Sequence, residues 1–188
     1  MCHFITAIIP AEASLDLLRG VARDHALALT KIHNPHVEAQ LTPSEHYYLT
    51  TSGSCDCGTV FGSRRRRERR SQASEPDERD VAALRRSGWS EAKIERWLSQ
   101  RAVTVSRNSR TERVRAQSDE LEAANWQHFL TEVLASGCTS IGILLHWYRG
   151  SYLHEKIQIL SRHSVSVAKI TPEFLTGLSE DELYVFTR

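Results

Sequence analysis

The front of the chain alternates short apolar runs with turn-forming residues. Within residues 3–9, Phe4, Ile5, Ile8 and Ile9 are apolar with little alternation, which indicates a strand that is buried on both faces. Pro10 ends this run, because proline cannot donate a hydrogen bond within a sheet. Ser14 then precedes apolar residues at helical spacing that fade near 25–28, which predicts a helix capped by that serine. The chain is therefore expected to open with a strand and a helix.

Two short extended pieces are expected next, over 29–33 and 37–41, with an Asn-Pro stop between them. Residues 46–51 are rich in tyrosine and threonine, a composition that favours a third strand. Residues 52–58 then form a loop of glycine, serine and aspartate that also carries two cysteines.

The middle of the chain has a different character. Residues 63–80 are almost wholly charged or polar and cannot bury enough apolar surface to offset the entropy of ordering, so we expect a flexible segment. Gly88 is typical of a residue that closes a helix, and Ser90 of one that caps the next. Apolar spacing predicts three helices in this part, at 80–87, 90–100 and 112–136.

The end of the chain is richer in strands. Residues 141–148 are the most apolar run and predict a central strand. Alternation favours further strands over 156–160 and 164–170, with a helix over 152–162 as the alternative. A short helix should begin at 171–173, and 183–187 predicts the last strand. This order indicates an α/β or α+β fold with a single mixed β-sheet, packed helices and an internal flexible basic segment.

The length of 188 residues fits one domain with a substantial core. We therefore expect a single domain over 1–188, in which four parts differ in composition. These are a strand-helix-strand front part at 1–62, a flexible Arg-rich segment at 63–80, a helical part at 81–136 and a strand-rich C-terminal part at 137–188.

Charge and targeting signals narrow the class of protein. The formal net charge is only +1, so any electrostatic function must come from local clustering. The longest apolar runs have the length of strands, and residues 1–12 lack the basic and apolar regions of a secretory signal. The four cysteines then indicate reduced thiols, and we expect a soluble, cytoplasmic protein with no membrane partner.

Cys55 and Cys57 suggest a zinc site. A C-x-C pair supplies at most half of a tetrahedral site, because zinc needs four ligands. Cys2 and His3 are the best remaining candidates, since they begin a strand that could lie beside 46–51, and Cys138 is a weaker one. The alternative is a set of ordinary reduced cysteines, because the usual signature of two closely spaced cysteine pairs is absent.

Cys2 also supports a different hypothesis. If Met1 is removed, Cys2 carries a thiol and a free α-amine, which can act as nucleophile and base within one residue. The protein would then be a cysteine enzyme with an N-terminal nucleophile. The competing interpretation is a cysteine buried at the start of a strand.

The arginine run supports a third hypothesis, nucleic-acid binding. Guanidinium groups neutralise phosphates and release counterions, and the helices at 80–87 and 90–100 are joined by a short turn compatible with a helix-turn-helix. The candidate residues are Arg64, Arg65, Arg66, Arg67, Arg69 and Arg70. The alternative is a solvated charge run that Glu75 and Asp77 neutralise locally.

Standard catalytic and nucleotide-binding motifs are absent from the sequence, and His146 is expected to be a core or sheet-end residue with its hydrogen bonds satisfied. This absence favours a non-enzymatic protein-binding module, such as an inhibitor or immunity-type protein that neutralises a protein partner. Trp89, Arg85 and Arg86 are the predicted partner surface, because tryptophan and arginine are enriched at binding hot spots. The alternatives are a zinc- or nucleic-acid-binding regulator and the cysteine enzyme.

Overall fold

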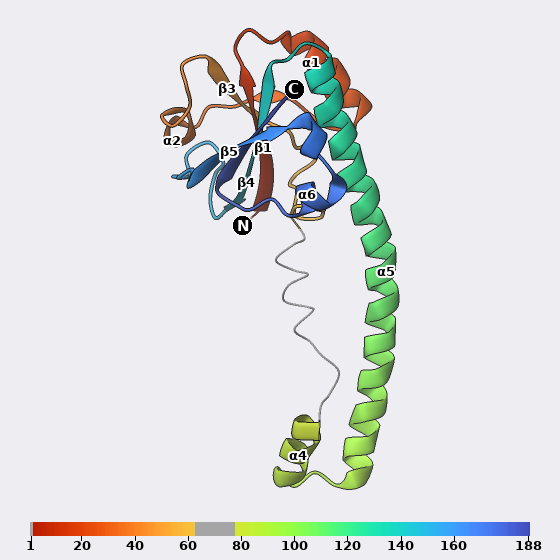
Figure 1. The fold of residues 1–188 in the computed structure, drawn as a ribbon. Coiled ribbons are helices and arrows are strands. Elements are labelled where there is room, and N and C mark those ends of the chain that lie inside the picture. The colour runs from red at the N-terminus through yellow and green to blue at the C-terminus, as the bar shows by residue number, and fades with distance from the viewer. Residues whose placement is uncertain (1, 63–77) are drawn as a thin grey trace. The chain divides into compact units, whose positions relative to one another are not determined.

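The computed structural model describes residues 2–62 and 78–188, without the side chains of residue 79 and of 104–115 (Figure 1). The Arg64–Arg70 run and most of the segment predicted to be flexible lie outside the described residues. The chain divides into two compact units. One unit contains residues 1–63 and 120–188, and the other contains residues 64–119.

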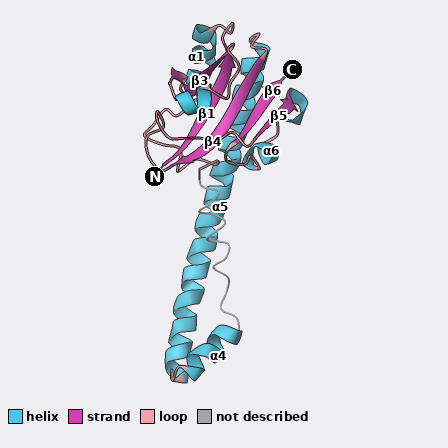
Figure 2. Ribbon diagram, turned by 90° about the vertical axis from the view of Figure 1, so that its left-hand side faces the viewer, coloured by secondary structure: helices cyan, strands magenta, loops and turns pink. Residues whose placement is uncertain are grey.

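The first unit is built on one six-stranded sheet with the order β2-β3-β1-β4-β6-β5 (Figure 2). All neighbouring strands are antiparallel except β5 and β6, which run parallel, so the sheet is mixed. The strands are β1 (Cys2–Pro10), β2 (Thr30–Lys31), β3 (Glu45–Leu49), β4 (Ser140–Tyr148), β5 (Ser161–Ser166) and β6 (Glu182–Thr187). The predicted α+β fold with a single mixed sheet is confirmed.

The helices include α1 (Leu15–Asp24), α2 (Pro35–Glu38), α4 (Glu78–Arg86), α5 (Glu91–Ala135), the 3₁₀ turn η1 (Val167–Lys169) and α6 (Pro172–Thr176). Figure 1 shows α1 beside the C-terminal part of α5. His25 joins them, because its Nδ1 lies 2.7 Å from Asn125 Oδ1. Leu18 of α1 and Trp126 and Phe129 of α5 pack with Ile5 on the same face of the sheet.

The opposite face of the sheet carries a second, smaller core. Phe4 and Tyr148 pack there with Tyr47, whose hydroxyl lies 3.0 Å from that of Tyr148. Val37 of α2 and Ile157 close this core from outside the sheet. The strand predicted over 3–9 is therefore confirmed, and both of its faces are buried, as its apolar residues without strict alternation indicate.

Four local predictions are wrong, each for a physical reason. The strand predicted over 164–170 ends at Ser166, because the chain turns into η1, where Ile170 N bonds to Val167 O. Residues 37–41 are not extended, because Asn34 caps α2 by accepting a hydrogen bond from His36 N, with Pro35 at the first helical position. Residues 156–160 are not a strand, since Ile157 O and Ile159 N bond to the side chain of Gln40 instead. The helices predicted at 90–100 and 112–136 are one helix, because the residues between them include no glycine or proline that would end it.

In the second unit, Gly88 ends α4 in the predicted way. Gly88 has a φ of 81°, a left-handed conformation that glycine adopts without strain. The following Trp89 N donates a hydrogen bond to Leu84 O. Ile94 is buried, whereas Trp97 and Leu98 are half-buried. Across the described residues of both units, no helix combines the length and apolarity needed to cross a membrane.

Asn34→Ala should lower the free energy of unfolding by about 2 kcal/mol, because it removes a helix cap and leaves buried carbonyls unpaired. The side-chain amide of Asn34 donates to Tyr152 O and Glu155 O, both at 3.0 Å. The measurement is urea denaturation. The matched control is His36→Ala, an exposed position in the same helix that should change stability by less than about 0.5 kcal/mol. Equal effects would contradict the role given to Asn34.

Candidate metal centre

The first half of β1 has no strand on one side. β3 ends at Leu49 and pairs only with Thr6–Pro10 of β1, so a loop over residues 50–58 covers the rest of that edge. Thr50 N donates to Ile5 O, and Thr50 Oγ1 donates to the same oxygen at 2.7 Å. Asp56 N then donates to His3 O at 2.8 Å. The loop thus continues the hydrogen bonding of a strand without being one.

Asp56 fixes this loop. Its carboxylate accepts hydrogen bonds from Ile5 N, at 2.8 Å, and from Thr51 Oγ1. Burial raises the pKa of Asp56, while the hydrogen bonds from Thr51 and Ile5 oppose that shift. A buried carboxylate with these partners is a strong anchor, because removing it would leave backbone groups unpaired.

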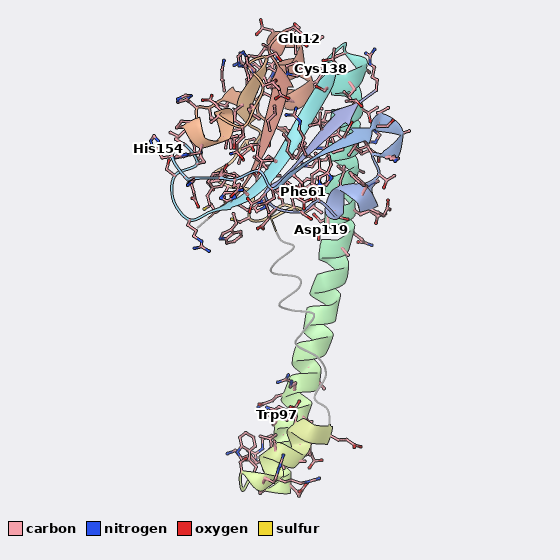
Figure 3. All side chains as sticks on the ribbon, turned by 60° about the vertical axis from the view of Figure 1, so that its left-hand side comes forward. Glu12, Phe61, Trp97, Asp119, Cys138 and His154 are labelled. Atoms are coloured by element: carbon pink, nitrogen blue, oxygen red, sulfur yellow. The ribbon has the colours of Figure 1, made fainter. Side chains whose placement is uncertain are left out.

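The loop is closed by Gly62. A Cβ atom at Gly62 would lie 2.0 Å from Asp56 O and 2.9 Å from Cys57 Cα, so only glycine fits without movement of the loop. Phe61, labelled in Figure 3, packs edge to face on Trp126 with ring centroids 5.4 Å apart. Val60 N donates to Glu122 Oε2 at 2.9 Å. The loop is therefore held both to β1 and to α5.

Three cysteines meet at this loop. The Sγ atoms of Cys2, Cys55 and Cys57 all lie within 4.8 Å of one another. All three residues are partly exposed and carry free thiols. Cys57 Sγ also accepts a hydrogen bond from His3 N at 3.2 Å. The sulfurs come from β1 and from the loop, which are far apart in the sequence.

The environments of the thiols differ. The backbone N–H of Cys57, and then its thiol, hydrogen-bond to Cys55 and lower the pKa of the Cys55 thiol. Burial raises the pKa of the Cys57 thiol. Zinc–sulfur bonds of about 2.3 Å place two sulfurs of one tetrahedron about 3.8 Å apart. The three sulfurs could therefore hold one ion after small movements of their side chains.

The other predicted ligands lie elsewhere. His3 is buried, and its Nε2 lies 3.9 Å from Glu180 Oε1. Successive side chains of a strand alternate between faces, so His3 and Cys2 face opposite sides of β1. Cys138 precedes β4, whose pairing with β1 places it at the far end of the sheet from Cys2 (Figure 3). Cys138 is buried, and its Sγ donates to Ser140 O.

The predicted partner surface lies in the second unit. Arg85 makes two hydrogen bonds to Glu91, at 2.8 and 3.0 Å. Trp89 is half-buried, with Lys93 Nζ 3.9 Å from its ring centroid, and Arg86 is exposed. The nucleic-acid hypothesis depends on residues outside the described part of the chain and stays a prediction. The same holds for Cys2 as an N-terminal nucleophile, because Met1 is not described.

A serine-histidine-glutamate group on β5 and β6 has the residue types of a catalytic triad but not the geometry. Ser161 Oγ and Glu182 Oε2 both contact His163 Nε2, at 2.8 and 3.0 Å. A triad needs the two partners on different ring nitrogens, so that the histidine can take the serine proton while the acid orients it. This group is therefore a surface hydrogen-bond cluster. It leaves the thiols as the strongest chemical feature among the described residues.

Sequence reasoning identified the three cysteines but missed Asp56 and Gly62. Asp56 lies between the two loop cysteines, where an aspartate in the sequence indicates only a turn residue. Gly62 lies in a stretch that carries no motif. Both roles follow from contacts with distant segments, which a local pattern does not encode.

Gly62→Ala should destabilise the protein by about 1–3 kcal/mol, because the added methyl group overpacks the loop. Gly58→Ala is the matched control in the same loop, since a Cβ there meets nothing within 4 Å. Thermal and urea unfolding of both variants are the measurements. A Gly62→Ala variant as stable as Gly58→Ala would show that the loop does not pack as described.

No family model matches the chain, and no curated protein or solved structure is similar to it. What the protein does is therefore inferred from the geometry of the three sulfurs and of the loop that presents them.

Proposed function

We propose that the protein binds a thiophilic metal ion, Zn²⁺ in the first instance, through Cys2, Cys55 and Cys57. The observation that carries this proposal is the approach of the three Sγ atoms to within 4.8 Å of one another. Thiolates are soft ligands that favour zinc and Cu(I) over the hard cations magnesium and calcium. A metal would neutralise the charge that accumulates when all three thiols lose their protons.

The loop supports the proposal because it presents the cysteines before any metal binds. Asp56 bonds to Ile5 N and Thr51 Oγ1, and its own N–H bonds to His3 O. These bonds do not involve the sulfurs. The metal-free protein should therefore stay folded, unlike a zinc finger, in which metal binding supplies the free energy of folding.

The coordination expected here is open. Among the described residues, no histidine or carboxylate joins the group of three sulfurs. Structural zinc sites are closed by four protein ligands, whereas sites with three leave a position for water or an added ligand. The partial exposure of all three cysteines is consistent with such a position facing solvent.

The purified protein should contain close to one zinc per chain, measured by elemental analysis. Cys55→Ser and Cys57→Ser should each lose the metal, because two thiolates do not complete a zinc site. Cys138→Ala is the control and should keep it. A chelator should lower the melting temperature, since saturation at 100 times Kd stabilises a fold by about 2.7 kcal/mol. A metal-free protein that takes up no added zinc would end the proposal.

The second candidate function is binding of a protein partner by the helical unit. It is favoured by the exposed Arg86 and by the half-buried Trp89, with its ring under Lys93. Arg85 is already paired with Glu91, so it contributes to a partner only if that pair opens. An inhibitor of the immunity type would use such a surface against an acidic site on its target.

Capture of a partner from the native host tests this second function. Once a partner is isolated, Trp89→Ala and Arg86→Ala should each weaken binding by about 1 kcal/mol or more. Arg96→Ala, another exposed arginine of the same unit, is the control and should leave the affinity unchanged. Equal affinities for all three variants would place the interface elsewhere.

A further inference from the structure

The three thiols of the metal site are also close enough to react with one another. Three pairs are conceivable, and the structure distinguishes them by how firmly each cysteine is held. Cys57 is held both to β1 and to the end of the loop. Its Sγ accepts a hydrogen bond from His3 N, and its Cα lies where a side chain at position 62 would collide with it.

The pair Cys55–Cys57 is disfavoured by ring size. A disulfide between residues two apart closes a small ring that departs from the preferred Cβ–S–S–Cβ geometry. Asp56 lies between them and is fixed to β1 by its carboxylate and by its N–H. The backbone is therefore not free to adjust to such a bond.

Cys2 and Cys55 lie on one surface. Both pack against the smaller core, which contains Phe4, whereas Cys57 does not. A bond between Cys2 and Cys55 leaves intact the hydrogen bond that His3 N donates to Cys57 Sγ. Both residues are partly exposed, so a small oxidant can reach them.

We propose that Cys2 and Cys55 form a reversible disulfide when the metal-free protein meets a hydroperoxide. The Cys55 thiolate attacks an oxygen of the hydroperoxide, the O–O bond breaks, and the leaving oxygen takes up a proton. Cys55 is then a sulfenic acid. The Cys2 thiol attacks that sulfur, the S–O bond breaks and water leaves. Two thiols are oxidised and one hydroperoxide is reduced, with water and an alcohol, or two waters, as products.

The disulfide and the metal would exclude each other, and this part of the inference rests on the proposed metal binding. The bond uses two of the three sulfurs, so Cys57 alone would remain as a ligand. The site would therefore release its metal under oxidising conditions and rebind it after reduction.

The test uses the full chain freed of metal with a chelator. It is treated with equimolar hydrogen peroxide, its remaining thiols are blocked with N-ethylmaleimide, and its peptides are mapped without reduction. The expected product has lost two hydrogens, joins Cys2 to Cys55, and carries the blocking group on Cys57 and Cys138. Cys57→Ser should form the same bond, and Cys55→Ser should not.

A second measurement follows the metal. In the zinc-loaded chain, peroxide should release zinc in step with the disulfide, and dithiothreitol should restore binding. A Cys55–Cys57 bond, oxidation of single thiols without a cross-link, or a Cys138 that is oxidised and so left unblocked would overturn the inference while leaving metal binding intact. A chain that forms the Cys2–Cys55 bond but never binds zinc would instead overturn the proposed function and the link between the two.

Discussion

The uncovered edge of β1 is the constraint on which the site depends. β3 stops at Leu49, so the backbone groups of His3 and Ile5 on that side would be buried without partners. Each such group costs about 1–3 kcal/mol when unsatisfied. Asp56 removes this cost for His3 O and Ile5 N with one N–H and one carboxylate, while Thr50 and Cys57 bond to Ile5 O and His3 N. The position of the loop cysteines is a consequence, because the residue between them is fixed to the strand that begins with Cys2.

The elements of the first unit could largely be predicted, because each buries a face whose apolar residues recur at a regular spacing in the sequence. The apolar residues at 3–9 do not alternate strictly with polar ones, which indicates a strand with cores on both sides, and β1 has both. The long helix could not be predicted in one piece. Its middle has no apolar stripe. The spacing of apolar residues indicates which face of a helix is buried, so it does not detect a helix that buries none. Residues 156–160 alternate like a strand, yet their backbone partners come from the side chain of Gln40, which no local pattern encodes.

The candidate site could be predicted only in part. The C-x-C pair is visible as letters, and Cys2 follows from the expectation that two predicted strands are neighbours, which β1 and β3 are. The sequence also predicts His3 as a zinc ligand, because it is adjacent to Cys2. The alternation of a strand separates the two side chains, so only Cys2 meets the loop. The supports, Asp56 and Gly62, depend on the path of the loop in space and carry no sequence motif.

Metal binding and disulfide formation would each cross-link the start of β1 to the loop. Asp56 already makes that connection through bonds that involve no sulfur. Neither state is then needed to keep the loop in place, and changing from one to the other need not unfold the edge of the sheet. A structural zinc site gains by making the fold depend on its metal. Here the carboxylate holds the loop whether or not a metal is bound, so a bound metal adds stability without being required for the fold. This favours a site whose occupancy can change with the conditions around the protein.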